Sequence, residues 1–350
     1  MQRLLASVLP VLQSNFKRLP HPYKLTFAIT YRCNSRCTIC NIWKKPHFPE
    51  MTLDNIKKFF TANPYFRWVN LTGGEVFLRP DLIEIIKIIL HTQKNLYFLN
   101  FPTNGIMTKQ IVKQLQQILN LNPPHFIVSI SLDGPKTTHD TLRGITGNWE
   151  KAVKTYKELK KLRSSHFDTY FGMTLSHYNN GLIEQTYEEL KKAIPSLKRS
   201  DIHFNIAHHS SHYYGNTAQD GNVNIKTIEH LDAYNKKKSF VLTKISFIEY
   251  VYQRHIKQYL TTKKTPLPCL ALSSSVFLNP YGMIYPCSMW NMPLANIQDI
   301  NYDLQALWNT KKTKQARILI ARKKCSNCWT PCEAYQSILG NMFTSEVWEK

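Results

Sequence analysis

The chain has 350 residues, of which 43% are hydrophobic, enough to bury the core of one large domain with an appendage. Its 45 Lys and Arg outnumber 23 Asp and Glu, and the resulting net charge of +22 should attract anionic partners. No apolar run approaches the ~20 residues needed to cross a bilayer. The N-terminal "MQRLLASVLPVLQSNFKRL" lacks a small-residue cleavage signature, so over 1–23 we expect a packed extension, with a secretory signal or peripheral membrane contact as alternatives.

Strand-like and helix-like segments alternate from residue 24 onward. The expected strands are 24–30, 68–74, 95–105, 125–134, 168–176 and 201–207. The expected helices are 53–63, 80–93, 107–120, 148–165 and 182–197. Six strands alternating with helices predict parallel β/α units, either a barrel or an open doubly wound sheet, with the functional face at the C-terminal ends of the strands.

This alternation ends near residue 236, at "YNKKKS". One long helix is expected over 239–262, followed by short strands within "SSVFLNPYGMIYPC" and a loop-rich end that contains cysteines. We therefore predict an N-terminal extension (1–23), a catalytic core (24–235), and a linker helix with a C-terminal module (236–350).

Eight cysteines fall into two tight groups that are separated by more than two hundred residues. The first group is Cys33, Cys37 and Cys40, and the second is Cys269, Cys287, Cys325, Cys328 and Cys332. Clustering in so large a chain indicates metal ligands rather than disulfides, and thiolate ligands are typical of a reducing compartment, so we expect a cytoplasmic protein.

The first group supplies three thiolates, which can hold three corners of a [4Fe–4S] cluster and leave the fourth iron free for a small chelating molecule. A structural zinc site would need a fourth ligand, for which His47 is a candidate. The C-x3-C-x2-C spacing differs from common zinc-finger spacings, and its place after the first strand suits a loop above a barrel mouth. The iron–sulfur interpretation is therefore favoured over zinc.

Three motifs together resemble the radical S-adenosylmethionine (SAM) superfamily. They are "CNSRCTIC" at 33–40, "LTGGEVFLRPDL" at 71–82 and "SLDGP…HD…RG" within 131–144, in the family's order. The resemblance implies a partial (β/α)6 TIM-like barrel of the α/β class. It also implies that SAM binds the open iron and is cleaved reductively to a 5′-deoxyadenosyl radical, which abstracts hydrogen from a substrate.

The resemblance also implies a set of SAM-binding residues. Gly73 and Gly74 would let the backbone approach a ligand, and Glu75 would accept from the amine of SAM. The remaining candidates end later strands or follow them: Asn104, Ser131, Asp133 and Arg143. Arg143 resembles the arginine that faces the SAM carboxylate. Turn or loop chemistry is the alternative for Asn104, Asp133 and Arg143.

The second group, with its C-x12-G-x4-C hairpin and "CSNCW", resembles the twitch or SPASM module of radical SAM enzymes. The module is expected as a small cysteine-rich α+β unit with one auxiliary [4Fe–4S] cluster, since a full SPASM module needs more cysteines. By spacing, the ligands are Cys269, Cys287, Cys325 and Cys328, while Cys332 either replaces one of them or is an inert buried thiol. Zinc is the alternative metal.

Two further features invite interpretation. The histidines of "HFNIAHHSSHYY" (203–214) are either surface residues or substrate contacts at the barrel mouth. The basic segment 311–324 is either a solvated helix face or a docking site for anions or lipid.

The sequence thus predicts a radical SAM enzyme whose auxiliary cluster relays an electron in an oxidation, dehydrogenation or cross-linking. A reductant such as flavodoxin or ferredoxin is expected, and the substrate class is open, with an anionic substrate as one candidate. Peptide maturation loses weight because only about 25 residues precede the first strand, too few for an extra peptide-recognition domain. The alternatives from other classes are a non-catalytic zinc protein that binds nucleic acid and a membrane-associated scaffold; no nucleic acid is expected for the favoured interpretation.

Overall fold

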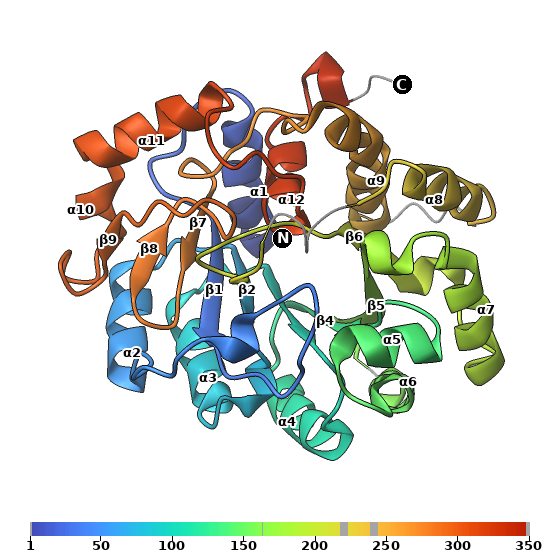
Figure 1. Ribbon diagram of the computed structural model, residues 1–350. Coiled ribbons are helices and arrows are strands. Elements are labelled where there is room, and N and C mark those ends of the chain that lie inside the picture. The colour runs from blue at the N-terminus through green and yellow to red at the C-terminus, as the bar shows by residue number, and fades with distance from the viewer. Residues whose placement is uncertain (1, 163, 218–222, 239–243, 348–350) are drawn as a thin grey trace.

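Nine strands form one continuous sheet that curves through the centre of the molecule, with helices packed outside it (Figure 1). The computed structural model describes residues 2–162, 164–217, 223–238 and 244–347. The strand order is β6-β5-β4-β3-β2-β1-β7-β8-β9, so the sheet is built by both halves of the chain.

The elements follow the chain in a regular order. The first six strands are β1 (Lys24–Thr30), β2 (Trp68–Gly73), β3 (Phe98–Thr103), β4 (His125–Ser131), β5 (Phe167–Leu175) and β6 (Ile202–Ile206). The helices between them are α2 (Leu53–Ala62), α3 (Leu82–Thr92), α4 (Thr108–Asn120), α5 (Lys136–Arg143), α6 (Asn148–Lys161) and α7 (Ile183–Ala193). The remaining helices are α1 (Gln2–Ser14), α8 (Thr227–Lys236), α9 (Lys244–Thr262), α10 (Leu304–Trp308), α11 (Lys311–Ala321) and α12 (Pro331–Leu339). The last strands are β7 (Ser275–Leu278), β8 (Met283–Tyr285) and β9 (Ala295–Asn296).

All neighbouring pairs from β1 to β6 are parallel, which confirms the predicted β/α core. Every residue of β1 is buried, because this central strand is covered on both faces. Alternate residues of the other strands serve different purposes: on β2, Val69 and Leu71 are fully buried on one face, whereas Asn70 and Thr72 line an internal cavity on the other.

The six-stranded barrel is not closed, because the second neighbour of β1 is β7 rather than β6. β7 pairs with β1 in parallel, with Lys24 opposite Ser275, and β8 and β9 then continue the sheet as antiparallel strands. The C-terminal module therefore extends the sheet of the core, which the sequence did not predict.

Helix α12 covers the open side of the barrel. Lys24, at the start of β1, donates from Nζ to Gln336 Oε1 of α12 at 2.7 Å. The exposed edge of β6 is held by α9, since Glu249 Oε1 accepts from the Phe204 amide at 3.1 Å. The N-terminal segment packs on α12, where Asn15 Nδ2 donates to the Leu339 carbonyl at 3.0 Å.

Several helices differ from the prediction. α5 lies where only a loop motif was expected, and α8, α10 and α12 were not predicted. The helix expected over 239–262 is observed from Lys244, and residues 239–243 are outside the described part of the chain. Among the described helices, none is long and apolar enough to cross a membrane.

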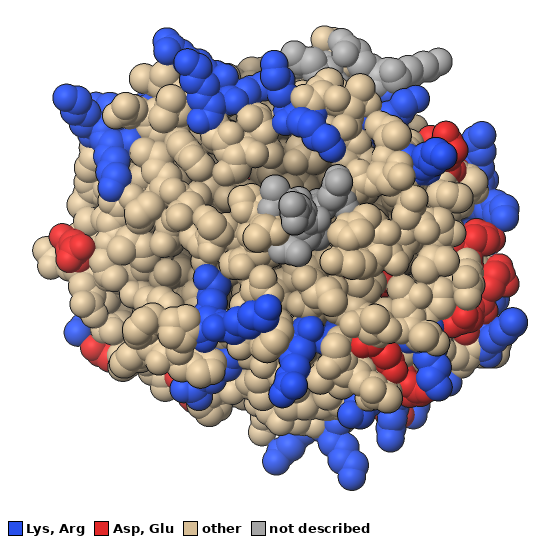
Figure 2. All heavy atoms as spheres, viewed as in Figure 1, with Lys and Arg blue, Asp and Glu red and all other residues tan. Residues whose placement is uncertain are grey.

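The surface carries the charge that the composition predicted. Lys and Arg side chains are spread over the face shown in Figure 2, whereas Asp and Glu gather mainly on its right side, around α7 of Figure 1. This face is hollowed near its centre.

Candidate active site

A cavity of about 320 Å³ lies inside the open barrel, a volume suited to a small molecule or one residue of a larger one. Its walls are the inward-facing positions of the strands, the loop after β1 and the first turn of α12. The inward residues include Asn70, Thr72, Asn100, Ser129, Ser131, Thr174 and Asn205. These positions alternate with buried apolar residues, so the strands present a polar face to the cavity and an apolar face to the helices.

The loop after β1 brings Cys33, Cys37 and Cys40 together on one wall of this cavity. Burial raises the pKa of Cys33 and of Cys40 to about 12, so the free thiols are protonated at neutral pH. The loop is fixed at its middle, where the Arg36 amide donates to the Arg143 carbonyl at 2.9 Å. It is fixed near its end by the Asn41 amide, which donates to the Tyr214 carbonyl at 2.8 Å.

Arg143 joins this loop to the end of β4. Its Nη2 atom is 2.6 Å from Asp133 Oδ2, and its Nη1 donates to Cys37 Sγ at 3.7 Å. The Arg143 side chain lines the cavity, but Asp133 does not; the second Asp133 oxygen accepts from the Thr174 amide at 2.8 Å. Asp133, which we expected to face cofactor or substrate, therefore holds Arg143 in place.

The two glycines of the "GGE" motif contact the root of the cysteine loop. Gly73 has φ +127°, and a Cβ there would lie 2.0 Å from the Thr30 carbonyl oxygen. A Cβ on Gly74 would lie 2.1 Å from the carbonyl oxygen of Arg32. Glycine is thus required at both positions because their backbone packs directly against the backbone of the cysteine loop. This requirement is separate from any approach of a ligand.

Glu75 is buried behind these glycines and accepts several hydrogen bonds. Its Oε2 accepts from the Asn104 amide at 2.7 Å, and its Oε1 accepts from Thr103 Oγ1 at 2.9 Å. Burial nevertheless raises the pKa of Glu75 to about 7. The Asn104 side chain donates to Asn34 Oδ1 at 2.6 Å, so this residue also supports the cysteine loop.

Two polar atoms at the cavity lack partners within the described chain. Ser35 Oγ and Arg143 Nε are buried without a hydrogen bond, and both residues line the cavity beside the three thiols. Three thiols, an arginine fork and an unpaired hydroxyl form a donor set that fits an iron–sulfur cluster with a polar cofactor.

The second group of cysteines divides into four and one. Burial raises the pKa of Cys269 to about 12, and Cys325 raises it further. Burial also raises the pKa of Cys287, to which Glu333, Cys328 and Cys269 add, so these thiols are near enough to influence one another electrostatically. Four neighbouring thiols fit a fully protein-ligated cluster. In the described chain, no three Cys, His, Asp or Glu side chains converge tightly enough to hold a single metal ion.

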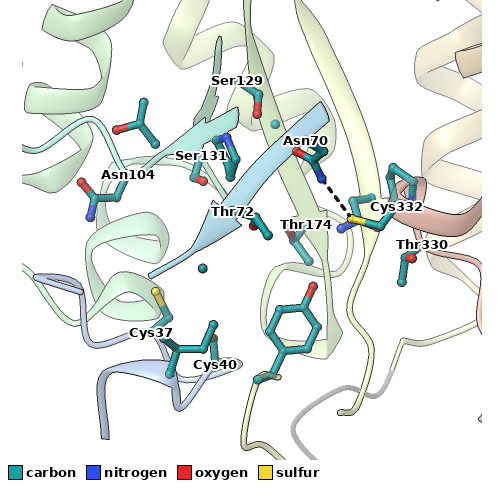
Figure 3. A pocket seen from close by; sticks show the side chains of 18 of the residues that line it. Cys37, Cys40, Asn70, Thr72, Asn104, Ser129, Ser131, Thr174, Thr330 and Cys332 are labelled. Atoms are coloured by element: carbon teal, nitrogen blue, oxygen red, sulfur yellow. Dashed lines mark hydrogen bonds between the residues drawn. The ribbon is translucent and has the colours of Figure 1, made fainter. Parts of the chain in front are cut away.

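Cys332 lies apart from these four and lines the barrel cavity (Figure 3). Its Sγ accepts from Asn70 Nδ2 at 3.8 Å, and its carbonyl accepts from Lys24 Nζ. The two predicted roles of Cys332, as a ligand of the second metal or as an inert buried thiol, stay predictions, and the structure adds that its side chain lines the cavity.

Two of the four histidines singled out in the segment 203–214 connect the barrel to the C-terminal module. His208 Nε2 accepts from the Trp329 amide at 2.9 Å, and its Nδ1 contacts the Ile206 carbonyl at 2.8 Å. His212 Nε2 contacts the Cys287 carbonyl at 3.2 Å. His203 lines the cavity and stacks on Tyr170 at 3.7 Å, whereas His209 is exposed. The sequence singled out these histidines but not their partners, which come from distant segments.

Residues 27–190 match the Radical SAM superfamily, and residues 269–329 match an iron–sulfur cluster-binding domain, SPASM. The antilisterial bacteriocin subtilosin biosynthesis protein AlbA of Bacillus subtilis is 31% identical over 42% of this chain and 32% of its own length. The AdoMet-dependent heme synthase of Methanosarcina barkeri is 30% identical over 49% of this chain and 48% of its own. The match thus spans less than half of each relative.

A solved structure shares the fold over most of the chain. It is SuiB of Streptococcus suis bound to precursor peptide SuiA, with a TM-score of 0.60 and 15% identity, covering 90% of this chain and 71% of that one. At this identity the similarity establishes the arrangement of the elements alone.

Replacing Gly73 should weaken the fold where the cysteine loop begins. We expect Gly73→Ala to lower the free energy of unfolding of the apoprotein by about 3 kcal/mol or more, because the new Cβ meets a backbone carbonyl at a positive φ. Gly147→Ala is the matched control, since Gly147 has φ +75° with nothing within 4 Å of its Cβ position, and it should cost only about 1 kcal/mol. Equal losses in urea unfolding would contradict this account.

His208 should make stability depend on pH. Burial lowers the pKa of His208 to about 4, below its usual 6.5, so its contribution is present above pH 6.5 and is lost as the pH falls toward 4. His208→Ala should lower the free energy of unfolding at pH 7.5 by about 2 kcal/mol, since it unpairs a buried amide. The difference between wild type and variant should shrink on acidification. His209→Ala, at the adjacent exposed position, should stay within about 0.5 kcal/mol of wild type at every pH.

Proposed function

Because the chain is a radical SAM enzyme with a C-terminal iron–sulfur cluster-binding domain, we propose that it removes a hydrogen atom from a substrate in the barrel cavity and relays electrons through the four-cysteine group. The observation that carries this proposal is the grouping of the thiols. Cys33, Cys37 and Cys40 share one cavity wall, so a cluster bound there keeps an iron open to a cofactor. When bound, the cluster and SAM supply the one-electron cleavage that generates a hydrogen-abstracting radical.

The residues around this wall have separate tasks in the proposal. Arg143 directs Nη1 toward Cys37 and keeps Nε unpaired, so it can compensate thiolate charge and bind a carboxylate. Glu75 offers a buried carboxylate for an amine, whose positive charge would lower the pKa of Glu75 and keep it ionised. Gly73 and Gly74 fix the turn on which Glu75 stands. Asp133 acts through Arg143 rather than on the cofactor.

The later strands supply the remaining contacts. Asn104 holds the cysteine loop through Asn34 and lines the cavity, and Ser131 presents an inward hydroxyl from β4. The walls leave room for a small bound group beside these side chains. We assign Asn104 and Ser131 to cofactor binding on this basis.

The four-cysteine group has a different role. Cys269, Cys287, Cys325 and Cys328 can ligate every iron of one [4Fe–4S] cluster, which then has no open site for substrate and can only pass electrons. None of these four residues is among the described residues that line the cavity. Together with the cluster at Cys33, Cys37 and Cys40, we thus propose two clusters per chain.

The substrate class that we propose is a peptide. AlbA is named for bacteriocin biosynthesis, and SuiB was solved with a precursor peptide. Both similarities support peptide maturation, the alternative to which the sequence analysis gave less weight because few residues precede the first strand. The heme synthase shows that a matching sequence also serves a small-molecule substrate. A cavity of about 320 Å³ admits one residue of a peptide, while the rest would lie on the basic surface outside.

The reductant is expected to be acidic. Arg32, Arg36 and Lys44 are exposed around the three thiols, and no Asp or Glu lies between Thr30 and Glu50. A protein donor such as flavodoxin or ferredoxin would approach this cationic rim, and high salt would slow the transfer.

Anaerobic reconstitution with iron counting tests the two-cluster proposal. The wild type should bind about 8 Fe per chain, and replacing Cys33, Cys37 and Cys40 with Ala should leave about 4 Fe, as should Cys269→Ala with Cys328→Ala. Only the second variant should still cleave SAM to 5′-deoxyadenosine. About 4 Fe in the wild type would remove the auxiliary cluster from the proposal, and wild-type protein unable to cleave SAM would overturn the proposal entirely.

The peptide proposal is tested with short peptides encoded beside the gene, each added to reduced wild-type enzyme and SAM. We expect one of them to raise 5′-deoxyadenosine formation above the peptide-free rate and to change mass or chirality, because a bound substrate couples cleavage to abstraction. A scrambled peptide of equal charge is the control. If small metabolites but no peptide raised 5′-deoxyadenosine formation, the proposed substrate class would be a small molecule instead of a peptide.

A further inference from the structure

Cys332 faces the cavity from the wall opposite the three thiols. In Figure 3, Cys37 and Cys40 lie on one side, and Cys332 and Thr330 lie on the other, with the strand residues between them. Cys332 is the second residue of α12, the helix that covers the open side of the barrel. A substrate in this cavity would therefore lie between the bound radical source and the Cys332 thiol.

The surroundings of Cys332 position a neutral thiol. Burial raises the pKa of Cys332, and nearby Lys24 lowers it in part. The thiol accepts a hydrogen bond from Asn70 at 3.8 Å, and Lys24 Nζ fixes the backbone carbonyl of Cys332. Lys24 is itself held over the Trp68 ring at 4.1 Å, so the base of this wall is fully packed.

The same wall contains an unpaired polar group. Thr330 is 2% exposed, it lines the cavity, and its Oγ1 has no hydrogen-bond partner in the described chain. A buried hydroxyl without a hydrogen-bond partner is energetically unfavourable. A substrate with a polar group beside Cys332, such as a peptide amide, would satisfy it.

We propose that Cys332 is a catalytic residue that donates a hydrogen atom to the substrate radical, which rests on the function proposed above. The carbon radical takes the hydrogen of Cys332 S–H, so that a C–H bond forms and a thiyl radical remains. This transfer is downhill because an S–H bond is weaker than an aliphatic C–H bond. The hydrogen first removed leaves in 5′-deoxyadenosine, and the new one arrives from the opposite face, so the carbon centre is inverted.

The thiyl radical needs one electron and one proton to return to the thiol. A low-potential one-electron donor supplies the electron through the four-cysteine group, and the proton comes from water. Tyr214 lies on this route: it lines the cavity, and Cys332, Cys40 and Cys328 all add to the rise in its pKa that burial causes. The electron relay then runs toward the cavity, and the overall change at the substrate is redox-neutral rather than oxidative.

The first experiment needs no substrate. The iron content of anaerobically reconstituted holoenzyme is measured for the wild type, for Cys332→Ser and for Cys269→Ser. We expect Cys332→Ser to retain the full wild-type iron content, because its thiol ligates no iron, whereas Cys269→Ser should lose iron. Iron loss in Cys332→Ser equal to that in Cys269→Ser would make Cys332 a ligand and overturn the proposal.

The second experiment uses the peptide that stimulates SAM cleavage, in D₂O with reduced enzyme. Wild type should return a peptide that carries one solvent deuterium at an inverted carbon. Cys332→Ser should still form 5′-deoxyadenosine but should lose the deuterium label. Equal labelling by the variant, or a wild-type product lighter by two hydrogens, would refute hydrogen donation while leaving hydrogen abstraction intact. Absence of 5′-deoxyadenosine in the wild type would instead refute the proposed function.

Discussion

The pairing of β1 with β7 is the constraint on which the site depends. Because a strand in a sheet has only two neighbours, β1 cannot also pair with β6, and the barrel stays open on one side. An open barrel exposes polar inward groups and unpaired strand edges, which α9 and α12 cover. The C-terminal segment therefore forms one wall of the cavity, and the two cysteine groups come close together for this topological reason.

Charge inside the molecule is arranged by burial as much as by pairing. The chain has a net charge of +22, yet among the described residues only two Lys or Arg side chains line the cavity, Lys24 and Arg143, and each is held by several partners. Unligated thiols in such a site are protonated, because burial raises the pKa of every cavity thiol. Metal binding must release those protons, so cluster assembly should couple to pH and to closure of the cysteine loop.

The sequence predicted the six parallel strands because their apolar positions alternate strongly, and the first cysteine group because its spacing is distinctive. It could not separate Cys332 from Cys328, since three intervening residues of unknown structure do not tell which way a thiol points. Asp133 shows a related ambiguity: a carboxylate at a strand end can face the cavity or a neighbouring arginine, and only the fold shows that it pairs with Arg143. The alternation of polar and apolar residues along β2 also indicates that Asn70 and Thr72 face the interior of the barrel, but we did not predict them as site residues.

Helix α12 joins the two sites through neighbouring residues. Cys332 faces the cavity, whereas Glu333 accepts from Ser275 Oγ of β7 at 2.8 Å and adds to the raised pKa of Cys269 and Cys287. Burial raises the pKa of Glu333 to about 7, and its Oε1 has no partner in the described chain. A change of charge at the four-cysteine group therefore acts on a residue adjacent to the proposed hydrogen donor, through one rigid turn of helix. This closeness arises because the segment that completes the open barrel also carries the four-cysteine group.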